Sequence, residues 1–236
     1  MINEKKILAI IPARSGSKGI KNKNIKIIAE KPLIFWTIKN ALASKYIDYV
    51  LVTTDSEEIS KIARDEDVEV PFLRPPHLSS DDAKMKDVIH HTLAWTKAND
   101  KFQSDQFILL QPTSPFRNNQ HIDEALELAN NNKKFSSVVS ITKVSKHPFW
   151  MKQIDNNGRI KDFINKKSED YNNRQNLPIL YQLNGAIYIA ENDYFYNNKV
   201  LFDQNSKPYV MDEYSSLDID SSFDWDVAQI LSKRML

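Results

Sequence analysis

The sequence predicts a three-layer α/β fold, in which a mainly parallel β-sheet lies between two layers of helices. Three observations lead to this prediction. Short apolar segments alternate with helical patterns over residues 1–144, and the links between them are short. The apolar segments are continuous, as is typical of strands buried on both faces. A length of 236 residues, 41% of them hydrophobic, is enough to bury a large core.

The N-terminal part predicts a strand, a polar loop and a helix. Residues 6–13 form a continuous apolar run after Lys6 and indicate a buried strand. A polar loop follows from Arg14 to about Lys26. Pro32 marks the start of a helix, because the missing N–H of proline costs no hydrogen bond there. The apolar residues of this helix are Leu33, Ile34, Ile38, Ala41 and Leu42.

The alternation continues with two short strands and a helix. Residues 49–53 predict a second buried strand. Asp55 and Glu58 have the spacing of a capping box, so we expect a helix to begin there and to end near residue 64. Residues 68–70 then predict a short strand.

The middle of the chain predicts two more helices and two more strands. We expect Asp81 or Asp82 to cap a helix that continues through Trp95. Residues 107–110 predict a buried strand, residues 118–130 a helix, and residues 137–141 another strand.

The pattern breaks at residues 145–180, the inserted segment. This segment is polar and Asn-rich, yet it carries large apolar side chains, namely Phe149, Trp150, Ile154, Ile160 and Phe163. We expect short strands and loops here, inserted into an α/β domain formed by residues 1–144 and 181–236. So many apolar groups do not suit a solvated loop, so we expect the inserted segment to pack on a second copy in a homodimer.

The C-terminal part returns to the α/β pattern. Residues 185–190 and 217–219 predict strands, and residues 222–234 predict an amphipathic helix. Asn184-Gly185 is compatible with a simple hairpin turn.

Composition excludes several classes of function. The chain has no Cys, so disulfide scaffolds, thiolate metal sites and cysteine nucleophiles are excluded. The apolar stretch at residues 7–13 is too short to span a membrane, and we expect a cytoplasmic protein with no membrane partner. Lys and Arg total 32 against 31 Asp and Glu, without the basic excess of a nucleic-acid binder.

Charge is nevertheless unevenly distributed along the chain. The basic loop, residues 14–31, carries six basic residues and one acid, whereas the acidic segment, residues 212–226, carries six acids and no base. If folding brings the two together, they suit a site for a metal ion and a polyphosphate.

The loop at residues 12–19 is the first candidate binding element. It follows a buried strand and holds two of the four glycines, Gly16 and Gly19, together with Arg14 and Lys18. Ligands of open α/β sheets bind at the carboxyl ends of strands, where loop N–H groups and cations attract anions. We therefore expect a phosphate-binding loop; the alternative is a surface loop with solvated bases. The spacing matches neither a Walker A loop nor a dinucleotide fingerprint.

Asp218 and Asp220 form the second candidate. On a strand, residues i and i+2 share a face, so both carboxylates could bind one Mg²⁺, which prefers one or two carboxylates plus substrate phosphates. The alternative is helix capping, by Asp220, Ser221 or Ser222.

These residues belong to a series of motifs that resembles one family along nearly the whole chain, the acylneuraminate cytidylyltransferases. The motifs are IIPARSGSKG at 10–19, KNKN at 21–24, TTDS at 53–56, LRP at 73–75, LQPTSP at 110–115, RQ at 174–175, NGAIYI at 184–189 and DID at 218–220. They occur in the order of the family.

The resemblance implies a Rossmann-like nucleotidyltransferase fold, a homodimer and a Mg²⁺-dependent reaction. That reaction moves CMP from CTP to the anomeric hydroxyl of a nine-carbon keto-sugar acid and releases pyrophosphate. By position, the resemblance implies that the CTP phosphates are held by Arg14, Ser17 and Lys18, with Lys23 and Asn24 nearby. It implies that Arg74 faces the cytosine. Mg²⁺ would be bound by Asp218 and Asp220, which together with Arg14 and Lys18 are the catalytic candidates.

The resemblance also implies a sugar-acid site. Its residues would be Gln111, Arg174 and Tyr188, with Leu201 and Phe202 near the acyl groups of the sugar. The planar guanidinium of Arg174 suits the sugar carboxylate. Two departures from the pattern are Met85, where some relatives have a serine that helps to hold the base, and a bulky segment at residues 147–150. The second departure is compatible with a related acid as the substrate, such as legionaminic or pseudaminic acid.

Three alternatives remain at this point. A cytidylyltransferase for the eight-carbon sugar acid of lipopolysaccharide usually shows Arg-Leu-Pro after its loop, where this chain has residues 18–21 as KGIK. A sugar-nucleotide-dependent glycosyltransferase normally carries its Asp-x-Asp motif after a mid-chain strand. A catalytically silent nucleotide-binding subunit would not need Arg14, Lys18, Asp218 and Asp220 together.

Overall fold

A computed structural model of the chain describes residues 2–17, 19–131, 137–164 and 173–235. These residues form one six-stranded sheet in the order β10-β6-β9-β5-β1-β4. Its strands are β1 (Ile7–Pro12), β4 (Tyr49–Thr53), β5 (Gln106–Leu109), β6 (Ser137–Lys143), β9 (Tyr181–Glu191) and β10 (Lys207–Met211). Strand β9 is antiparallel to β5 and β6, and the other neighbouring pairs are parallel. The predicted mainly parallel sheet is confirmed.

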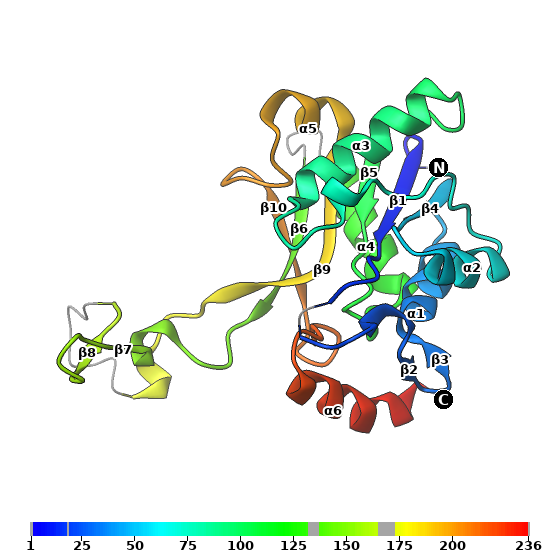
Figure 1. The fold of residues 1–236 in the computed structure, drawn as a ribbon. Coiled ribbons are helices and arrows are strands. Elements are labelled where there is room, and N and C mark those ends of the chain that lie inside the picture. The colour runs from blue at the N-terminus through cyan, green and yellow to red at the C-terminus, as the bar shows by residue number, and fades with distance from the viewer. Residues whose placement is uncertain (1, 18, 132–136, 165–172, 236) are drawn as a thin grey trace.

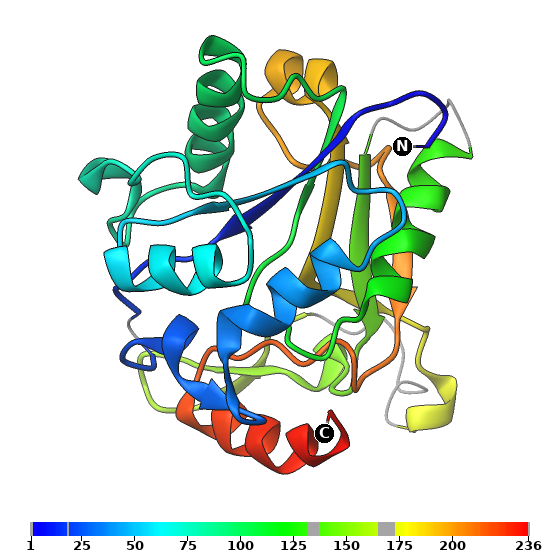
Figure 2. The same cartoon turned by 90° about the vertical axis from the view of Figure 1, so that its right-hand side faces the viewer.

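Helices cover both faces of this sheet (Figures 1 and 2). One face carries α1 (Leu33–Leu42), α2 (Glu57–Asp65) and α4 (Asn119–Asn130), and the other carries α3 (Met85–Ala98) and α5 (Asn192–Asn198).

The continuous apolar sequence of β1 explains this layering. All six residues of the strand are buried. Ile7, Ala9 and Ile11 belong to the core under α1, α2 and α4. Leu8 and Ile10 belong to the core under α3 and α5. Because successive strand residues point to opposite faces, both faces need an apolar cover.

A third apolar cluster lies beneath helix α6 (Ser222–Leu231). It joins Trp225 of α6 to Ile20 of the basic loop, to Ile28 of the small antiparallel pair β2 (Ile27–Ile28) and β3 (Lys31–Pro32), and to Ile219 of the acidic segment. This packing brings the basic loop and the acidic segment together.

The inserted segment leaves the sheet between β6 and β9. It contains the short helices η3 (Pro148–Trp150) and η5 (Arg174–Asn176) and the antiparallel strands β7 (Lys152–Ile154) and β8 (Ile160–Asp162). Figure 1 shows the β7–β8 hairpin at the end of an arm, joined to the sheet by the long strand β9. Every residue of β7 and β8 is exposed.

Some predicted elements are wrong. Residues 217–219 are irregular, because the N–H of Ile219 donates to the carbonyl of Thr113 in a loop. Ile219 is apolar because it is fully buried in the third cluster, not because it lies in a strand. Residues 68–70 are not a strand either; they contribute only an isolated bridge between Leu51 and Glu69.

Helix starts also differ from the prediction. Ser56, not Asp55, is the N-cap of α2, and its hydroxyl accepts the N–H of Ile59. Helix α3 starts at Met85 after Lys84, without a side-chain cap from Asp81 or Asp82.

Helix α5 and the edge strand β10 are not predicted, since their sequences are polar and β10 contains a proline. Among the described helices, none is long and apolar enough to cross a membrane.

Candidate active site

A cavity of about 380 Å³ lies at the carboxyl ends of β1 and β5. Its walls come from the basic loop, from the loop after β5 and from the acidic segment. Seven residues predicted from the sequence line it, namely Arg14, Ser17, Lys23, Asn24, Arg74, Gln111 and Asp220. Gly19 and Met85 also line it. The fold therefore brings most of the predicted nucleotide-binding residues to one place, while Lys18 lies outside the described residues.

Gly19 fits where a side chain would not. A Cβ on this residue would lie 2.1 Å from the backbone oxygen of Asp220, a distance that real Cβ atoms do not adopt. The basic loop is thus pressed against the acidic segment, and only glycine permits this approach. Nearby, the buried side chain of Asn24 donates its Nδ2 to the carbonyl of Arg14 at 3.0 Å and fixes the loop from within.

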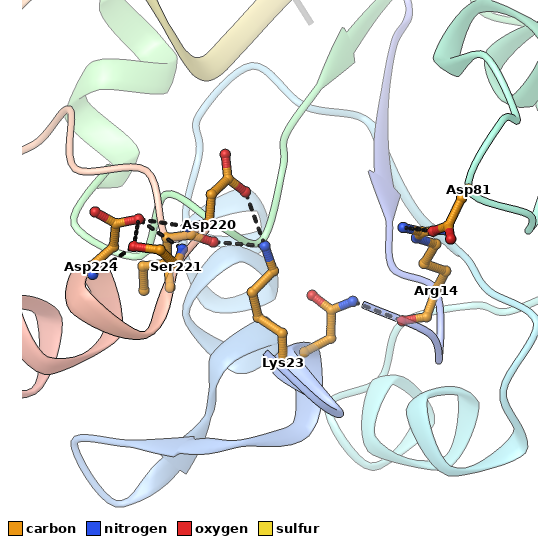
Figure 3. Close-up of polar contacts among 8 residues, drawn as sticks. Arg14, Lys23, Asp81, Asp220, Ser221 and Asp224 are labelled. Carbon is orange, nitrogen blue, oxygen red and sulfur yellow. Dashed lines mark hydrogen bonds and ion pairs between the residues drawn. The ribbon is translucent and has the colours of Figure 1, made fainter. Parts of the chain in front are cut away.

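Two cations of the cavity are paired with carboxylates (Figure 3). Arg14 Nη2 lies 2.7 Å from Asp81 Oδ1. Lys23 Nζ donates to the carbonyl of Ile219 at 2.6 Å and to Asp220 Oδ1 at 3.1 Å. The positive charge of the basic loop is thus matched by anionic groups at both ends of the cavity.

Arg74 is a buried cation on the cavity wall. It is 5% exposed, and its Nε donates to Ser79 Oγ at 3.2 Å. Its Nη2 is buried and makes no hydrogen bond within the part of the chain that the structure describes. Burial lowers the pKa of Arg74, and the charge of Asp55 opposes this effect. An unsatisfied buried N–H is costly, so this position suits a ligand that offers an acceptor.

Asp218 and Gln111 converge on Gly185. A Cβ on Gly185 would lie 3.1 Å from Asp218 Oδ2 and 3.2 Å from Gln111 Oε1. Asp218 Oδ1 is buried without a hydrogen-bond partner among the described residues. Burial is the main cause that raises the pKa of Asp218, and the nearby charge of Asp220 adds to it. Asp220 itself is largely exposed, with 75% of its side-chain surface accessible.

Helix capping does not explain these two carboxylates. Ser221 is the N-cap of α6: its Oγ accepts the N–H of Asp224 at 3.2 Å, and Asp224 Oδ2 accepts the N–H of Ser221 at 2.8 Å. The prediction that Asp218 and Asp220 share the face of a strand is wrong, because this segment is irregular. The acidic side chains remain close through the loop and not through strand geometry.

A bulge in β9 places Gly185. The pairing of β6 with β9 jumps from Val139–Tyr188 to Ile141–Leu183, so residues 184–187 face a single residue, Ser140. Buried Asn184 accepts the hydroxyl of Ser140 at 2.6 Å and donates to Ser216 Oγ at 2.9 Å. Asn184-Gly185 is therefore a bulge in mid-strand and not a hairpin turn. It ties β6 to the segment that leads to Asp218.

Three of the predicted sugar-acid residues, Tyr188, Leu201 and Phe202, lie together next to the β9 bulge. Tyr188 stacks on Phe202 with ring centroids 6.0 Å apart, and Leu201 packs on the same core cluster. Burial is the main cause that raises the pKa of Tyr188, and the charge of Asp218 contributes. Arg174 lies in η5 of the inserted segment, and its side chain is outside the described part of the structure.

Sequence reasoning misses Arg117, which lies two residues beyond the LQPTSP motif. Its side chain is fully buried and binds the carbonyl of Gln111 on the cavity wall. The only signal in the sequence is a basic residue close to the end of a buried strand, next to Phe116.

A mainly parallel α/β sheet, a glycine-containing cationic loop after its first strand and facing carboxylates define the class of nucleotide-binding α/β proteins. Within this class the profile of the cytidylyltransferase family matches residues 8–229. The chain belongs to this family.

The relatives of known name also point to the cytidylyltransferase family. The chain is 39% identical to an N-acylneuraminate cytidylyltransferase of Escherichia coli, over 97% of this chain and 52% of that protein. It is also 39% identical to the CMP-N,N'-diacetyllegionaminic acid synthase of Legionella pneumophila, over 96% of each chain. The chain thus spans about half the length of the first relative and nearly all of the second.

Solved structures show the same fold. A structure of CMP:2-keto-3-deoxy-manno-octonic acid synthetase complexed with CTP matches with a TM-score of 0.70 and 16% identity, over 98% of this chain and 100% of the other. A 4-diphosphocytidyl-2C-methyl-D-erythritol synthase from Anaerococcus prevotii matches with a TM-score of 0.63 and 19% identity, over 99% and 98%. The predicted α/β nucleotidyltransferase fold is confirmed.

Proposed function

We propose that the protein transfers CMP from CTP to the anomeric hydroxyl of a nine-carbon keto-sugar acid and releases pyrophosphate. One observation carries the proposal: the fold gathers Arg14, Ser17, Lys23, Arg74 and Gln111 around one cavity, beside the carboxylate of Asp218. The family and the relatives named above support the same reaction. The protein would act in the cytoplasm, where CTP is present.

The basic loop would hold the triphosphate. Arg14, Lys18 and Lys23 supply positive charge, and Ser17 and Asn24 lie among them, as the resemblance implies. Phosphoryl-type transfer requires mainly alignment and charge neutralisation. Charge on the leaving pyrophosphate grows towards the transition state, so fixed cations at this position lower the barrier.

Arg74 would recognise the base. Its buried Nη2 has no acceptor among the described residues, and a cytosine offers carbonyl and ring-nitrogen acceptors on one edge. Met85 lies on the same cavity wall, so the base would also meet an apolar surface there.

Asp218 and Asp220 fit a divalent cation. Asp218 Oδ1 is buried and unpartnered in the described structure, and the missing side chain of Gly185 leaves space beside Oδ2. No third carboxylate or histidine joins them among the described residues, which suits Mg²⁺, since it commonly binds one or two carboxylates plus substrate phosphates. When bound, Mg²⁺ would neutralise charge on the phosphates of CTP.

The sugar acid would lie on the other side of Gln111. Gln111 offers an amide that can both donate and accept hydrogen bonds to sugar hydroxyls. Tyr188, Leu201 and Phe202 form an apolar surface for the acyl groups. Arg174 would bind the sugar carboxylate with two parallel hydrogen bonds.

A direct assay tests the proposal. The protein is incubated with CTP, Mg²⁺ and single sugar acids: N-acetylneuraminic, legionaminic, pseudaminic and the eight-carbon acid of lipopolysaccharide. Release of pyrophosphate together with a CMP-sugar is expected with at least one nine-carbon acid. Turnover of the eight-carbon acid alone would replace the proposed substrate class, and turnover of none would refute the activity.

The active enzyme would be a homodimer built through the inserted segment. Large apolar side chains lie exposed on it, namely Trp150, Met151, Ile154, Ile160, Phe163, Ile164 and Ile179. Exposed apolar surface of this kind marks an interface. In a two-fold dimer the same patch of each copy would pack against the other copy.

A further inference from the structure

Arg117 is a fully buried cation whose hydrogen-bond acceptors are all neutral. Its Nη1 donates to the carbonyl of Gln111 at 3.1 Å and to the carbonyl of Ala186 at 2.7 Å. Its Nη2 donates to Thr37 Oγ1 at 2.8 Å. Its Nε is buried without a partner in the described part of the chain.

This arrangement is costly for the fold alone. Burial lowers the pKa of Arg117 to about 9, so the side chain remains charged at neutral pH. A buried charge without an opposite charge is unfavourable, and a well-packed apolar side chain of similar volume is often as good or better for stability. The position of the charge therefore calls for a reason beyond packing.

Two of the three acceptors belong to segments that meet at the candidate site. Gln111 follows β5 and lines the cavity, and Ala186 directly follows Gly185 in the β9 bulge. Thr37 belongs to α1 and anchors the far side of the guanidinium. One nitrogen, Nη1, thus bridges the backbone at Gln111 and the backbone beside Gly185, the residue on which the side chains of Gln111 and Asp218 converge.

The same loop also supports the acidic segment. Residues 111–117 form a turn in which the carbonyl of Thr113 accepts the N–H of Ile219 at 2.9 Å. Ile219 lies between Asp218 and Asp220. The α1 side chain Asn40 donates to the carbonyl of Arg117 at 2.9 Å and fixes the end of the turn. A shift at Arg117 would therefore reach both Gln111 and the two carboxylates.

We propose that Arg117 is a positioning residue for the transfer reaction, rather than only a part of the core. Its rigid fork holds the carbonyls of Gln111 and Ala186 in fixed relative places. This sets the separation of the Gln111 amide from Asp218 across Gly185. Positioning of this kind matters because a misplacement of about 1 Å costs on the order of 100-fold in rate. The inference rests on the proposed function.

Two variants at Arg117 separate geometry from charge. Arg117→Lys keeps the positive charge but replaces the planar fork with a flexible ammonium, and Arg117→Met removes both. Thr37→Val is the matched control, because it removes one acceptor of the same guanidinium and leaves both carbonyl contacts intact. Each protein is assayed at least about 10 °C below its own melting temperature, with CTP binding measured separately by calorimetry.

We expect both Arg117 variants to lose about 100-fold or more in kcat for CMP transfer, with CTP affinity changed by less than about threefold. Thr37→Val should lose melting temperature but keep kcat within about threefold. Hydrogen exchange in peptides covering residues 110–117 and 183–188 should accelerate in both Arg117 variants and not in Thr37→Val. This readout does not depend on turnover, so it tests the positioning role even if wild-type protein transfers no CMP.

Four results would overturn the proposal. Rescue of kcat by Arg117→Lys would show that charge and not geometry is required. Equal loss of kcat in Thr37→Val and the Arg117 variants would show a merely structural role. The same holds if both Arg117 variants fail to fold. Unchanged exchange in the two peptides would mean that the guanidinium does not hold them.

Discussion

Gly185 allows Asp218 and Gln111 to share a small space. It has a φ of 72°, in the left-handed region that favours glycine. A Cβ there would lie within 3.2 Å of oxygens of both Asp218 and Gln111. Conformation and crowding act at the same residue, and a matched pair of variants can separate them.

Gly185→Ala should impair catalysis more than stability. The positive φ costs about 1–2 kcal/mol for a residue with a Cβ, and crowding should displace Gln111 or Asp218, with a loss of about 100-fold in kcat. Gly158→Ala is the control, since its φ is 75° and nothing lies within 4 Å of its Cβ position. Melting curves and steady-state kinetics of both variants check this. Similar kcat in the two variants would contradict the role of crowding.

Asp218→Asn and Asp220→Asn test the predicted metal ligands. Each change removes an anionic oxygen while keeping shape, so the fold should survive and Mg²⁺-dependent turnover should fall by at least about 100-fold, the scale of losing one electrostatic contact to the transition state. Asp226→Asn is the control, because it removes one negative charge from an exposed position of α6 in the same acidic segment. It should keep both stability and turnover. Near-normal turnover in either test variant would show that its carboxylate is not a ligand.

At the scale of elements, the pattern of burial decided what could be predicted. Strands β1 and β5 are buried along their whole length and β4 over its last three residues, and their continuous apolar sequences indicate them directly. Strand β10 escapes prediction because only its last residue is buried and it contains a proline. Ile219 misleads because its apolar character comes from packing in a cluster with Ile20 and Ile28, which lie far away in the sequence.

The candidate site follows the same rule. The loop after β1 could be predicted because its glycines and bases follow a buried strand. The ion pairs Arg14–Asp81 and Lys23–Asp220 could not, since they join residues far apart in sequence. Arg117 could not be distinguished from a surface arginine without the three acceptors that surround it.

The segment of residues 75–84 contacts two arginines that line the cavity, Arg14 and Arg74. Arg74 donates to Ser79, and Arg14 pairs with Asp81. Asp81→Asn should therefore release Arg14 for phosphate binding and lower KM for CTP. A partly exposed ion pair contributes about 0.2–1 kcal/mol, so the expected gain is at most about fivefold.

Asp82→Asn provides the control for Asp81→Asn. It removes one negative charge from the adjacent residue, which makes no ion pair with Arg14 in the described structure. Its KM for CTP should change less than that of Asp81→Asn. If both variants lower KM equally, the effect is general electrostatics and the Arg14–Asp81 pair does not compete with the nucleotide.

At the scale of the whole molecule, the α/β domain contains the cavity, whereas the inserted segment extends from the sheet as an arm (Figure 1). Ile154 and Ile160 are paired residues of the β7–β8 hairpin and are 77% and 75% exposed. Cross-strand partners lie on the same face of a hairpin. The arm therefore presents an apolar face whose burial requires a second surface, and the proposed homodimer provides one.

Ile154→Glu combined with Ile160→Glu should convert the protein to a monomer. Burial of an isoleucine contributes about 1.5–3 kcal/mol, and a two-fold interface contains each residue twice. Four such losses amount to at least about 6 kcal/mol, or a dimer weakened by about 10⁴-fold. Sedimentation velocity at micromolar concentration measures this directly.

Phe223→Glu, on helix α6 at 73% exposure, is the control and should sediment like the wild type. If Arg174 of one chain serves the site of the other, the monomer should also lose turnover of the sugar acid while still binding CTP. A double variant that sediments as the wild type would exclude the hairpin from the interface.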